Sequence, residues 1–204
     1  MTSARSPLHR AAAGRLAVGD PLGALNRVDP ESGEILHTLT CPEVGTGVAW
    51  DGEFVWNTSF ESRMLLKLDP QSGEVLQRIP LPGEGFFTGL AYDGEFLWLG
   101  EYEQPGALHK IDPRSGEVVH TIRSDRYVTG ISWFGDDLWH ATSAVQDMST
   151  GKTSELRRVD SESGAVLERL SVPTNVSGLS ALGDQFFCGD CTSNHVRIVP
   201  RPAQ

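Results

Sequence analysis

Residues 88–122 read TGLAYDGEFLWLGEYEQPGALHKIDPRSGEVVHTI, and close copies of this stretch recur along the chain. Residues 46–79 read TGVAWDGEFVWNTSFESRMLLKLDPQSGEVLQRI. Residues 129–170 repeat the pattern with an insertion, residues 177–199 stop early, and the segment before residue 40 matches the later two-thirds of a unit. One aspartate marks the same position in each unit, at spacings of 40, 43 and 48 residues: Asp29, Asp69, Asp112 and Asp160. This period indicates a repeat architecture in which each unit packs on its neighbours.

Each unit divides into four short strands separated by turn residues. In residues 88–122 these are TGLAY, EFLWLG, LHKID and VVHTI, here named strands a, b, c and d. An Asp-Gly or Gly-Asp pair joins a to b and accepts the positive φ of a tight hairpin. The DPxSGE connection joins c to d, with an aspartate to hydrogen-bond the turn and a glycine for its left-handed position. No segment has helical periodicity. The sequence therefore predicts an all-β fold, a small β-propeller of four-stranded antiparallel blades.

The predicted blades lie within a single domain that spans residues 1–204. Their approximate bounds are 8–40, 46–80, 87–122, 128–170 and 176–200. Five blades follow if residues 8–40 form a degenerate first blade, and four follow if residues 35–39 supply the outer strand that the last unit lacks. We favour five. In both cases we expect the ring to close through the chain termini, which removes exposed sheet edges.

The charge balance limits the kinds of partner. The 204 residues include 17 Lys and Arg against 27 Asp and Glu, a formal net charge of −10. Nucleic acid and anionic membranes both require a basic surface, so we expect neither as a partner. The balance suits a cationic or metal-bound ligand. The ligand that we expect, a small molecule or a peptide, would bind in the central pocket of the propeller.

The same composition bears on location. No apolar run approaches the roughly 18 residues of a membrane span, and the first 19 residues lack the continuous apolar stretch of a secretory signal. Three cysteines are too few for a disulfide framework. A cytoplasmic location is the expectation that follows.

The repeat also separates scaffold from site. In a propeller the a–b and c–d turns lie on one face, and the b–c loops and d–a connections lie on the other. The first face is nearly uniform from unit to unit, so we interpret its repeated acids as structural. In the last four units strand b carries one large aromatic ring, which we interpret as filling the space between blades: Trp56, Trp98, Trp139 and Phe187.

The opposite face differs from unit to unit. Diversity at equivalent positions is what a ligand site requires, because each group meets a different part of the ligand. The alternative is that these loops vary because nothing constrains them. The candidate ligand-binding residues are Asn57, Phe86, Tyr102, Arg126, Tyr127 and Asn175.

Three residues on that face are candidate catalytic acid–base groups: Glu101, His140 and Asp190. The near-neutral pKa of an ordinary histidine suits proton transfer, although a single histidine is also often merely hydrogen-bonded.

Two sets of residues are candidate metal ligands. Asp20, Glu101 and Asp190 occupy equivalent positions where strand b ends, so their carboxylates could converge on Mg²⁺ or Ca²⁺. The alternative is solvated surface acids. Cys188, Cys191 and His195 form CxxCxxxH, a less favoured zinc set because structural zinc sites use four ligands. Buried or idle thiols are the alternative there. No other cofactor is indicated.

The units LWLGEYEQPGALHKIDPRSGEVVHTI and VWNTSFESRMLLKLDPQSGEVLQRI resemble blades of the streptogramin (virginiamycin B) lyase-like and YVTN/NHL-type propellers, which read LW-x-x-E followed by KIDPxTG. The resemblance covers most of the chain but lies mainly in scaffold positions. It implies a metal-assisted lyase that opens a cyclic peptide, in a family with seven blades. Glu101 falls on that family's repeated glutamate, but the other units carry Ser59, Thr142 and Asp190 there, and the family's catalytic His and Glu cannot be traced.

Residues 87–94, FTGLAYDG, resemble the FTQGL-x-YDG segment of the glutamine cyclotransferases, which are five-bladed propellers that cyclise an N-terminal glutamine. The glutamine of that segment is missing here, and Leu99 stands where the family has a glutamate. The resemblance implies acid–base catalysis, with Glu101 as the residue that could carry it. The rival hypothesis is a non-catalytic protein-interaction module that uses the whole variable face.

Overall fold

The computed structural model describes residues 16–20, 23–41, 43, 45–144, 153–190, 193 and 195–201, with the backbone alone for residues 16–20. All regular structure within these residues is β-strand. No helix long and apolar enough to cross a membrane occurs in this part of the chain.

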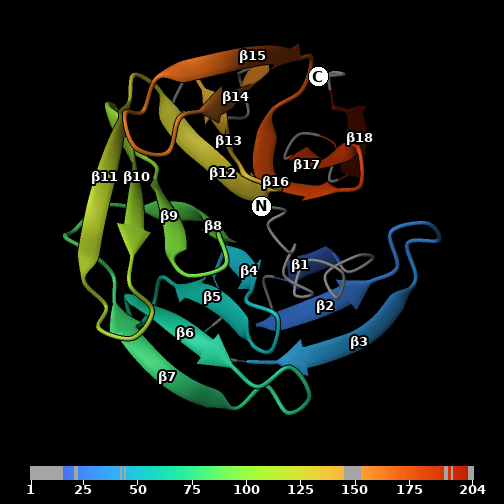
Figure 1. The fold of residues 1–204 in the computed structure, drawn as a ribbon. Coiled ribbons are helices and arrows are strands. Elements are labelled where there is room, and N and C mark those ends of the chain that lie inside the picture. Colours follow the sequence, from blue (N-terminus) through green and yellow to red (C-terminus); the bar gives the residue numbers. More distant parts are fainter. Residues whose placement is uncertain are drawn as a thin grey trace, which may run out of the picture.

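The strands form five antiparallel sheets, which Figure 1 shows as a ring in chain order. The first sheet contains β1 (Leu16–Asp20), β2 (Ala24–Val28) and β3 (Ile35–Thr40). The second contains β4 (Val48–Trp50), β5 (Val55–Ser59), β6 (Met64–Leu68) and β7 (Val75–Pro80). The third contains β8 (Phe87–Tyr92), β9 (Leu97–Glu101), β10 (Gly106–Ile111) and β11 (Val118–Ser124). The fourth contains β12 (Tyr127–Phe134), β13 (Asp137–Ser143), β14 (Ser154–Val159) and β15 (Val166–Val172). The last contains β16 (Val176–Leu182), β17 (Gln185–Asp190) and β18 (His195–Pro200).

This arrangement confirms the all-β propeller. The second, third and fourth sheets hold strands a to d. Among the described residues the first sheet holds strands b, c and d, and the last holds a, b and c. Ile35–Thr40 pairs with β2, so it completes the first sheet and not the last one. The first and last sheets, which come from the two ends of the chain, follow each other in the ring (Figure 1).

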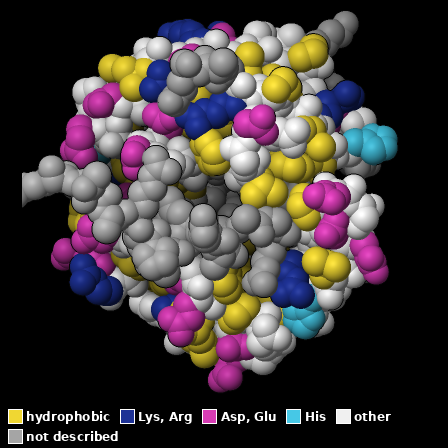
Figure 2. All heavy atoms as spheres, turned by 45° about the vertical axis from the view of Figure 1, so that its right-hand side comes forward, with side chains coloured by type: hydrophobic (Ala, Val, Ile, Leu, Met, Phe, Trp, Pro, Cys, Tyr) yellow, Lys and Arg dark blue, Asp and Glu magenta, His cyan; other side chains and the backbone are white. Residues whose placement is uncertain are grey.

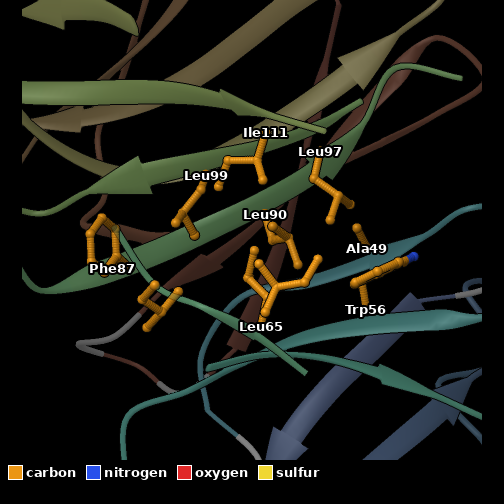
Figure 3. Close-up of a cluster of buried hydrophobic side chains, with 10 residues drawn as sticks. Ala49, Trp56, Leu65, Phe87, Leu90, Leu97, Leu99 and Ile111 are labelled. Carbon is orange, nitrogen blue, oxygen red and sulfur yellow. The ribbon is translucent and has the colours of Figure 1, made fainter. Parts of the chain in front are cut away.

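Apolar cores fill the spaces between neighbouring sheets. Between the second and third sheets Trp56 and Leu65 pack against Leu90 and Leu97 (Figure 3). Similar clusters follow around the ring, with Trp98 beside Leu138 and Trp139 beside Phe186. The three tryptophans are at most 1% exposed, which agrees with their interpretation as scaffold.

The innermost strands touch through one glycine each. A Cβ atom on Gly47 would lie 2.8 Å from the carbonyl oxygen of Thr88, and one on Gly89 would lie 2.5 Å from the amide nitrogen of Ile131. A Cβ atom on Gly130 would lie 2.6 Å from the amide nitrogen of Leu179. Such approaches exclude any side chain, so the repeated Thr-Gly or Ser-Gly of strand a sets the spacing of the strands around the axis.

The turn face is uniform because each turn repeats the same hydrogen bonds. Asp69 Oδ1 accepts the N–H groups of Gln71 and Ser72 at 2.9 and 2.7 Å, and Gly73 has a φ of 75°. These hydrogen bonds lower the pKa of Asp69. The same turn recurs at Asp29, Asp112 and Asp160. The interpretation of the repeated acids as structural therefore agrees with the structure.

In two sheets an aspartate at the start of the a–b hairpin accepts a hydrogen bond from the buried tryptophan of strand b. Trp56 Nε1 donates to Asp51 Oδ2 at 2.8 Å, and Trp98 Nε1 donates to Asp93 Oδ2 at 2.9 Å. Phe134 takes the aspartate position in the fourth sheet, and there the buried Trp139 Nε1 has no partner in the described part of the chain. The Asp-Gly hairpins thus satisfy a buried donor as well as making a turn.

We expect Gly89→Ala to destabilise the ring by about 2–3 kcal/mol, because the added methyl overlaps the backbone of β12. Gly135→Ala is the control, since Gly135 has a φ of 62° and open space around its Cβ position. That control should cost about 1 kcal/mol. Urea unfolding measures both, and equal losses would contradict the packing role of Gly89.

Candidate functional site

The b–c loops and d–a connections form one face of the ring, here called the rim. Four aromatic side chains on it form a continuous line: Phe60, Phe86, Tyr102 and Tyr127. Phe60 and Phe86 stack with centroids 4.3 Å apart, Phe86 meets Tyr102 edge-on at 6.1 Å, and Tyr102 lies 4.9 Å from Tyr127. The structure therefore brings together the three predicted aromatic residues and adds Phe60. We call these four side chains the rim row.

Backbone contacts hold the rim row in place. The Tyr102 N–H donates to the Phe86 carbonyl at 2.6 Å. The Arg63 guanidinium donates to the carbonyls of Gly83 and Gly85 at 2.7 and 3.3 Å. The segment before β8 is thus fixed from two sides, although the Phe86 ring itself is 47% exposed. An exposed aromatic ring on a fixed backbone is suited to binding.

Glu101, the last residue of β9, lies beside the rim row. Its carboxylate packs directly over Gly85. Glu101 Oε2 is 3.4 Å from His109 Nε2, and His109 Nδ1 is 3.0 Å from Thr121 Oγ1. Burial lowers the pKa of His109, while the Glu101 charge opposes that shift. A mostly neutral imidazole can donate to one neighbour and accept from the other. His109 can therefore donate to the Glu101 carboxylate while it accepts from the Thr121 hydroxyl.

Acidic residues surround the rim row in the sequence: Glu61, Glu84, Glu101, Glu103 and Asp125. Two arginines close to the row, Arg63 and Arg126, are engaged by other groups. Arg63 binds backbone carbonyls, and Arg126 NH1 lies 3.2 Å from Glu155 Oε1. A ligand at the rim row therefore meets an acidic surface.

Two of the predicted site residues are buried and hydrogen-bonded within the scaffold, and their roles in a site stay predictions. The fully buried Asn57 accepts from the Gly45 N–H at 2.9 Å and donates to the Gly47 carbonyl at 2.8 Å. The buried Asp190 accepts from Arg197 Nε and from the Ser193 hydroxyl, both at 2.8 Å. These contacts stabilise the approach to β4 and the last sheet respectively.

His140 also differs from the expectation of a near-neutral acid–base group. It is 2% exposed and lies opposite Arg157 in the β13–β14 register. Burial, and after it the Arg157 charge, lower the pKa of His140 to about 3. Arg157 is held in turn by Asp125 and Glu155. His140 is therefore neutral at physiological pH, and its role as a catalytic acid–base group stays a prediction.

The metal hypotheses gain no support from the described residues, where no three His, Cys, Asp or Glu side chains gather. The side chain of Asp20 and the whole of Cys191 lie outside those residues. Cys188 is fully buried, and burial raises the pKa of its thiol to about 12. His195 is exposed on β18. Asn175, at 2% exposed, stays a prediction as a ligand-binding residue.

A central cavity of about 750 Å³ opens among the inner strands. Its walls include Gly47, Gly89, Gly130 and Gly178, one from each inner strand, and Phe60. Because Phe60 belongs to both the wall and the rim row, the rim row begins where the cavity opens.

His109 and Phe60 were missed for different reasons. His109 stands three residues before the turn aspartate Asp112, where the other units carry Asn26, Leu66 and Arg157. That variation inside strand c is a sequence signal for a site residue. Phe60 directly follows strand b, and its pairing with Phe86 depends on how closely the second and third sheets approach each other, which the sequence does not show.

Comparisons with known proteins place the fold. No family model matches the chain, and no curated protein matches its sequence. The solved glutaminyl cyclase of Myxococcus xanthus superposes with a TM-score of 0.66 at 14% identity, covering 92% of this chain and 87% of that one. Hydrazine synthase of Kuenenia stuttgartiensis gives 0.53 at 18%, covering 81% and 46%, and a chain of the mitotic checkpoint complex gives 0.55 at 14%, covering 93% and 62%.

These identities establish likeness of fold alone. The chain spans about half the length of the hydrazine synthase chain that it matches. The likeness to the glutaminyl cyclase agrees with the expected propeller, whereas neither a family model nor a curated sequence supports the streptogramin-lyase type.

We expect His140 to remain neutral from pH 8 down to pH 5 in the folded protein. Its folded pKa lies below the roughly 6.5 of an unfolded histidine. The unfolded chain therefore takes up the proton first, and stability falls as the pH drops below about 6.5, by up to about 1.4 kcal/mol per pH unit. Imidazole chemical shifts in an NMR titration measure this. A His140 midpoint near 6.5 in the folded protein would refute the burial argument.

Proposed function

We propose that the rim row binds a small molecule or peptide that carries a cationic amine. The observation that supports this most is the row of four aromatic rings with the Glu101 carboxylate packed over Gly85, directly before Phe86. An aromatic face attracts a cation by about 0.5–1 kcal/mol when exposed and by about 2 kcal/mol when desolvated. A carboxylate adds a charge-assisted hydrogen bond to an ammonium group.

The surrounding charges favour the same sign of ligand. Acids flank every ring of the row in the sequence, and Arg63 and Arg126 are occupied by other partners. An anionic ligand would meet repulsion here, while a cation would be attracted. The apolar part of such a ligand would lie along the remaining rings, toward Phe60 and the mouth of the central cavity.

Glutaminyl cyclisation is a second candidate, supported by the fold likeness to the Myxococcus xanthus glutaminyl cyclase. In such a reaction the α-amino nitrogen of an N-terminal glutamine attacks its side-chain amide carbon, the new C–N bond closes the ring, and the amide nitrogen leaves as ammonia. One proton has to move from the attacking amine to the leaving nitrogen. Glu101, backed by His109 at 3.4 Å, is the rim group suited to carry that proton.

A non-catalytic protein-interaction surface is the rival for the same row. The exposure of Phe86 favours it, because rings that lie open on a surface often serve protein contacts. Both hypotheses place the ligand on the rim row. They differ in whether a reaction follows binding.

The test uses the peptide Gln-Phe-Ala-amide with a free amino group, and its N-acetylated form. We expect isothermal titration calorimetry to detect binding of the free-amine peptide, and acetylation to weaken it. Phe86→Ala and Glu101→Gln should each weaken binding about 5- to 10-fold, or about 1–1.4 kcal/mol. The melting temperature should scarcely change, since neither side chain is buried in the core.

Val119→Ala and Glu117→Gln are the matched controls, because both residues are exposed in β11 or just before it, away from the rim row. Binding that is equal in rim variants, controls and parent would overturn the proposal. Mass spectrometry that detects loss of ammonia from the peptide distinguishes cyclisation from binding without reaction. Loss of ammonia from the glutamine peptide, abolished by Glu101→Gln, supports cyclisation, and binding without loss supports the non-catalytic role.

A further inference from the structure

Three arginines converge on one glutamate beside the connection from the third to the fourth sheet. Glu155 of β14 lies 3.2 Å from Arg126 NH1 through Oε1, and its Oε2 lies 2.9 Å from Arg157 NH2 and 3.8 Å from Arg169 NH1. A second carboxylate, that of Asp125, contacts Arg157 NH1 at 2.5 Å. We call these five side chains the arginine cluster. Its three guanidinium groups share two carboxylates, which leaves positive charge in excess.

An excess of positive charge is unusual in this protein. The chain carries a formal net charge of −10, and Figure 2 shows acidic and basic side chains interspersed over one side of the molecule. The exposed Arg78, by contrast, is paired with its own carboxylate, Glu43, at 2.6 Å. Neighbouring guanidinium groups repel one another unless anions lie between them. The arginine cluster therefore has capacity for one more anionic group.

The buried member of the cluster has a donor left over. The Arg157 side chain is 2% exposed, and it donates through Nε to Glu155 at 2.9 Å and through NH1 to Asp125. Its NH2 nitrogen has no aligned hydrogen-bond partner in the part of the chain that the structure describes. A buried donor without an acceptor is costly. The Asp125 side chain reaches this guanidinium from the surface, since it is 72% exposed, so a carboxylate from solution can approach along the same side.

Comparison between units shows that the charge at this position is reversed. In the third sheet Glu101 ends strand b, and His109 of strand c lies behind it at 3.4 Å. The equivalent positions of the fourth sheet hold Thr142 and Arg157. The third sheet therefore presents a carboxylate to the rim, and the fourth sheet presents guanidinium groups.

The two charges lie close together on the rim. A Cβ atom on Gly106 would lie 2.4 Å from the carbonyl oxygen of Arg126 and 3.3 Å from that of Glu101. Tyr127, the last ring of the rim row, follows Arg126 directly. Successive ring centroids from Phe86 to Tyr127 are 6.1 and 4.9 Å apart. An extended tripeptide, at about 10 Å, has the length to lie along these rings with one end at each charge.

We infer that the arginine cluster binds the free C-terminal carboxylate of a peptide of about three residues whose ammonium group lies at Glu101. The inference rests on the proposed function for the ammonium end and adds a second recognition site at the other end. Guanidinium groups bind carboxylates through charge-assisted hydrogen bonds. The ligand carboxylate lies beside Arg126 and Arg169, where it competes with the exposed Asp125. The rim thus selects its ligand by length as well as by charge.

The first test compares Gln-Phe-Ala, with a free carboxylate, and Gln-Phe-Ala-amide by isothermal titration calorimetry. We expect the acid to bind about 5-fold more tightly than the amide. Arg126→Gln and Arg169→Gln should each remove most of this preference. Arg78→Gln is the matched control, because it removes one positive charge from an arginine that pairs with a single glutamate, and it should leave the preference unchanged.

The outcomes separate this inference from the proposed function. An amide that binds as tightly as the acid would overturn the inference and leave the amine site standing. Binding of the acid alone, lost in Arg126→Gln, would support the carboxylate site and overturn the amine site. If neither peptide binds, both fall.

The second test removes the competing carboxylate. Asp125→Asn keeps the shape of the side chain and removes its charge, so the preference for the acid over the amide should rise at least about 2-fold. The melting temperature should fall, because the buried Arg157 loses a charged partner, and binding is therefore measured well below the melting temperature of the variant. If Asp125 served only to neutralise Arg157, the preference would stay as in the parent, and that result would overturn the inference.

Discussion

The close approach of backbone to backbone at the inner glycines is the constraint on which the rest of this structure depends. Inner strands can come within van der Waals contact of each other only where no Cβ intervenes, and Gly47, Gly89 and Gly130 provide this at three successive junctions. Their spacing sets how far the sheets splay outward, and the tryptophans of strand b then fill the wedge between them. The positions of the rim loops follow from that geometry, because each loop joins strands whose places the axis has already fixed.

The difference in sequence variability between the turn face and the rim has a physical origin. On the turn face four units connect strands c and d by the same tight turn, so the same aspartate and glycine recur with the same hydrogen bonds. On the rim no common turn is required, and the loop sequences differ from unit to unit. Three neighbouring sheets contribute rings to one row there, while Arg63 and the Tyr102 N–H fix its backbone. The proposed binding of a cation rests on this acidic and aromatic surface, because aromatic faces attract positive charge.

The sequence predicted the fold well because its signals are local. Strand alternation, the Asp-Gly hairpins and the DPxSGE turns each act within a few residues, and the repeat supplies them several times. The candidate site could be predicted less well, because it depends on which side chains the strands bury and pair, and no local sequence pattern shows this. The polarity of Asn57 and His140 suggested ligand contact, but the neighbouring strands bury both side chains. The partnership of Glu101 with His109 joins strands b and c of one sheet, and its signal lay in strand c, which looked like scaffold.

Native-state hydrogen exchange tests the central role of the inner glycine contacts most directly. If these contacts hold the ring together, the hydrogen-bonded amides of β8 and β12 exchange only through global unfolding, with the free energy that urea unfolding gives. The outer strands β7 and β15 then exchange through smaller openings, because one edge of each is free in the described sheets. Exchange from β8 and β12 at free energies as low as those of β7 and β15 would contradict the account, since it would mean that the axis opens as readily as the periphery.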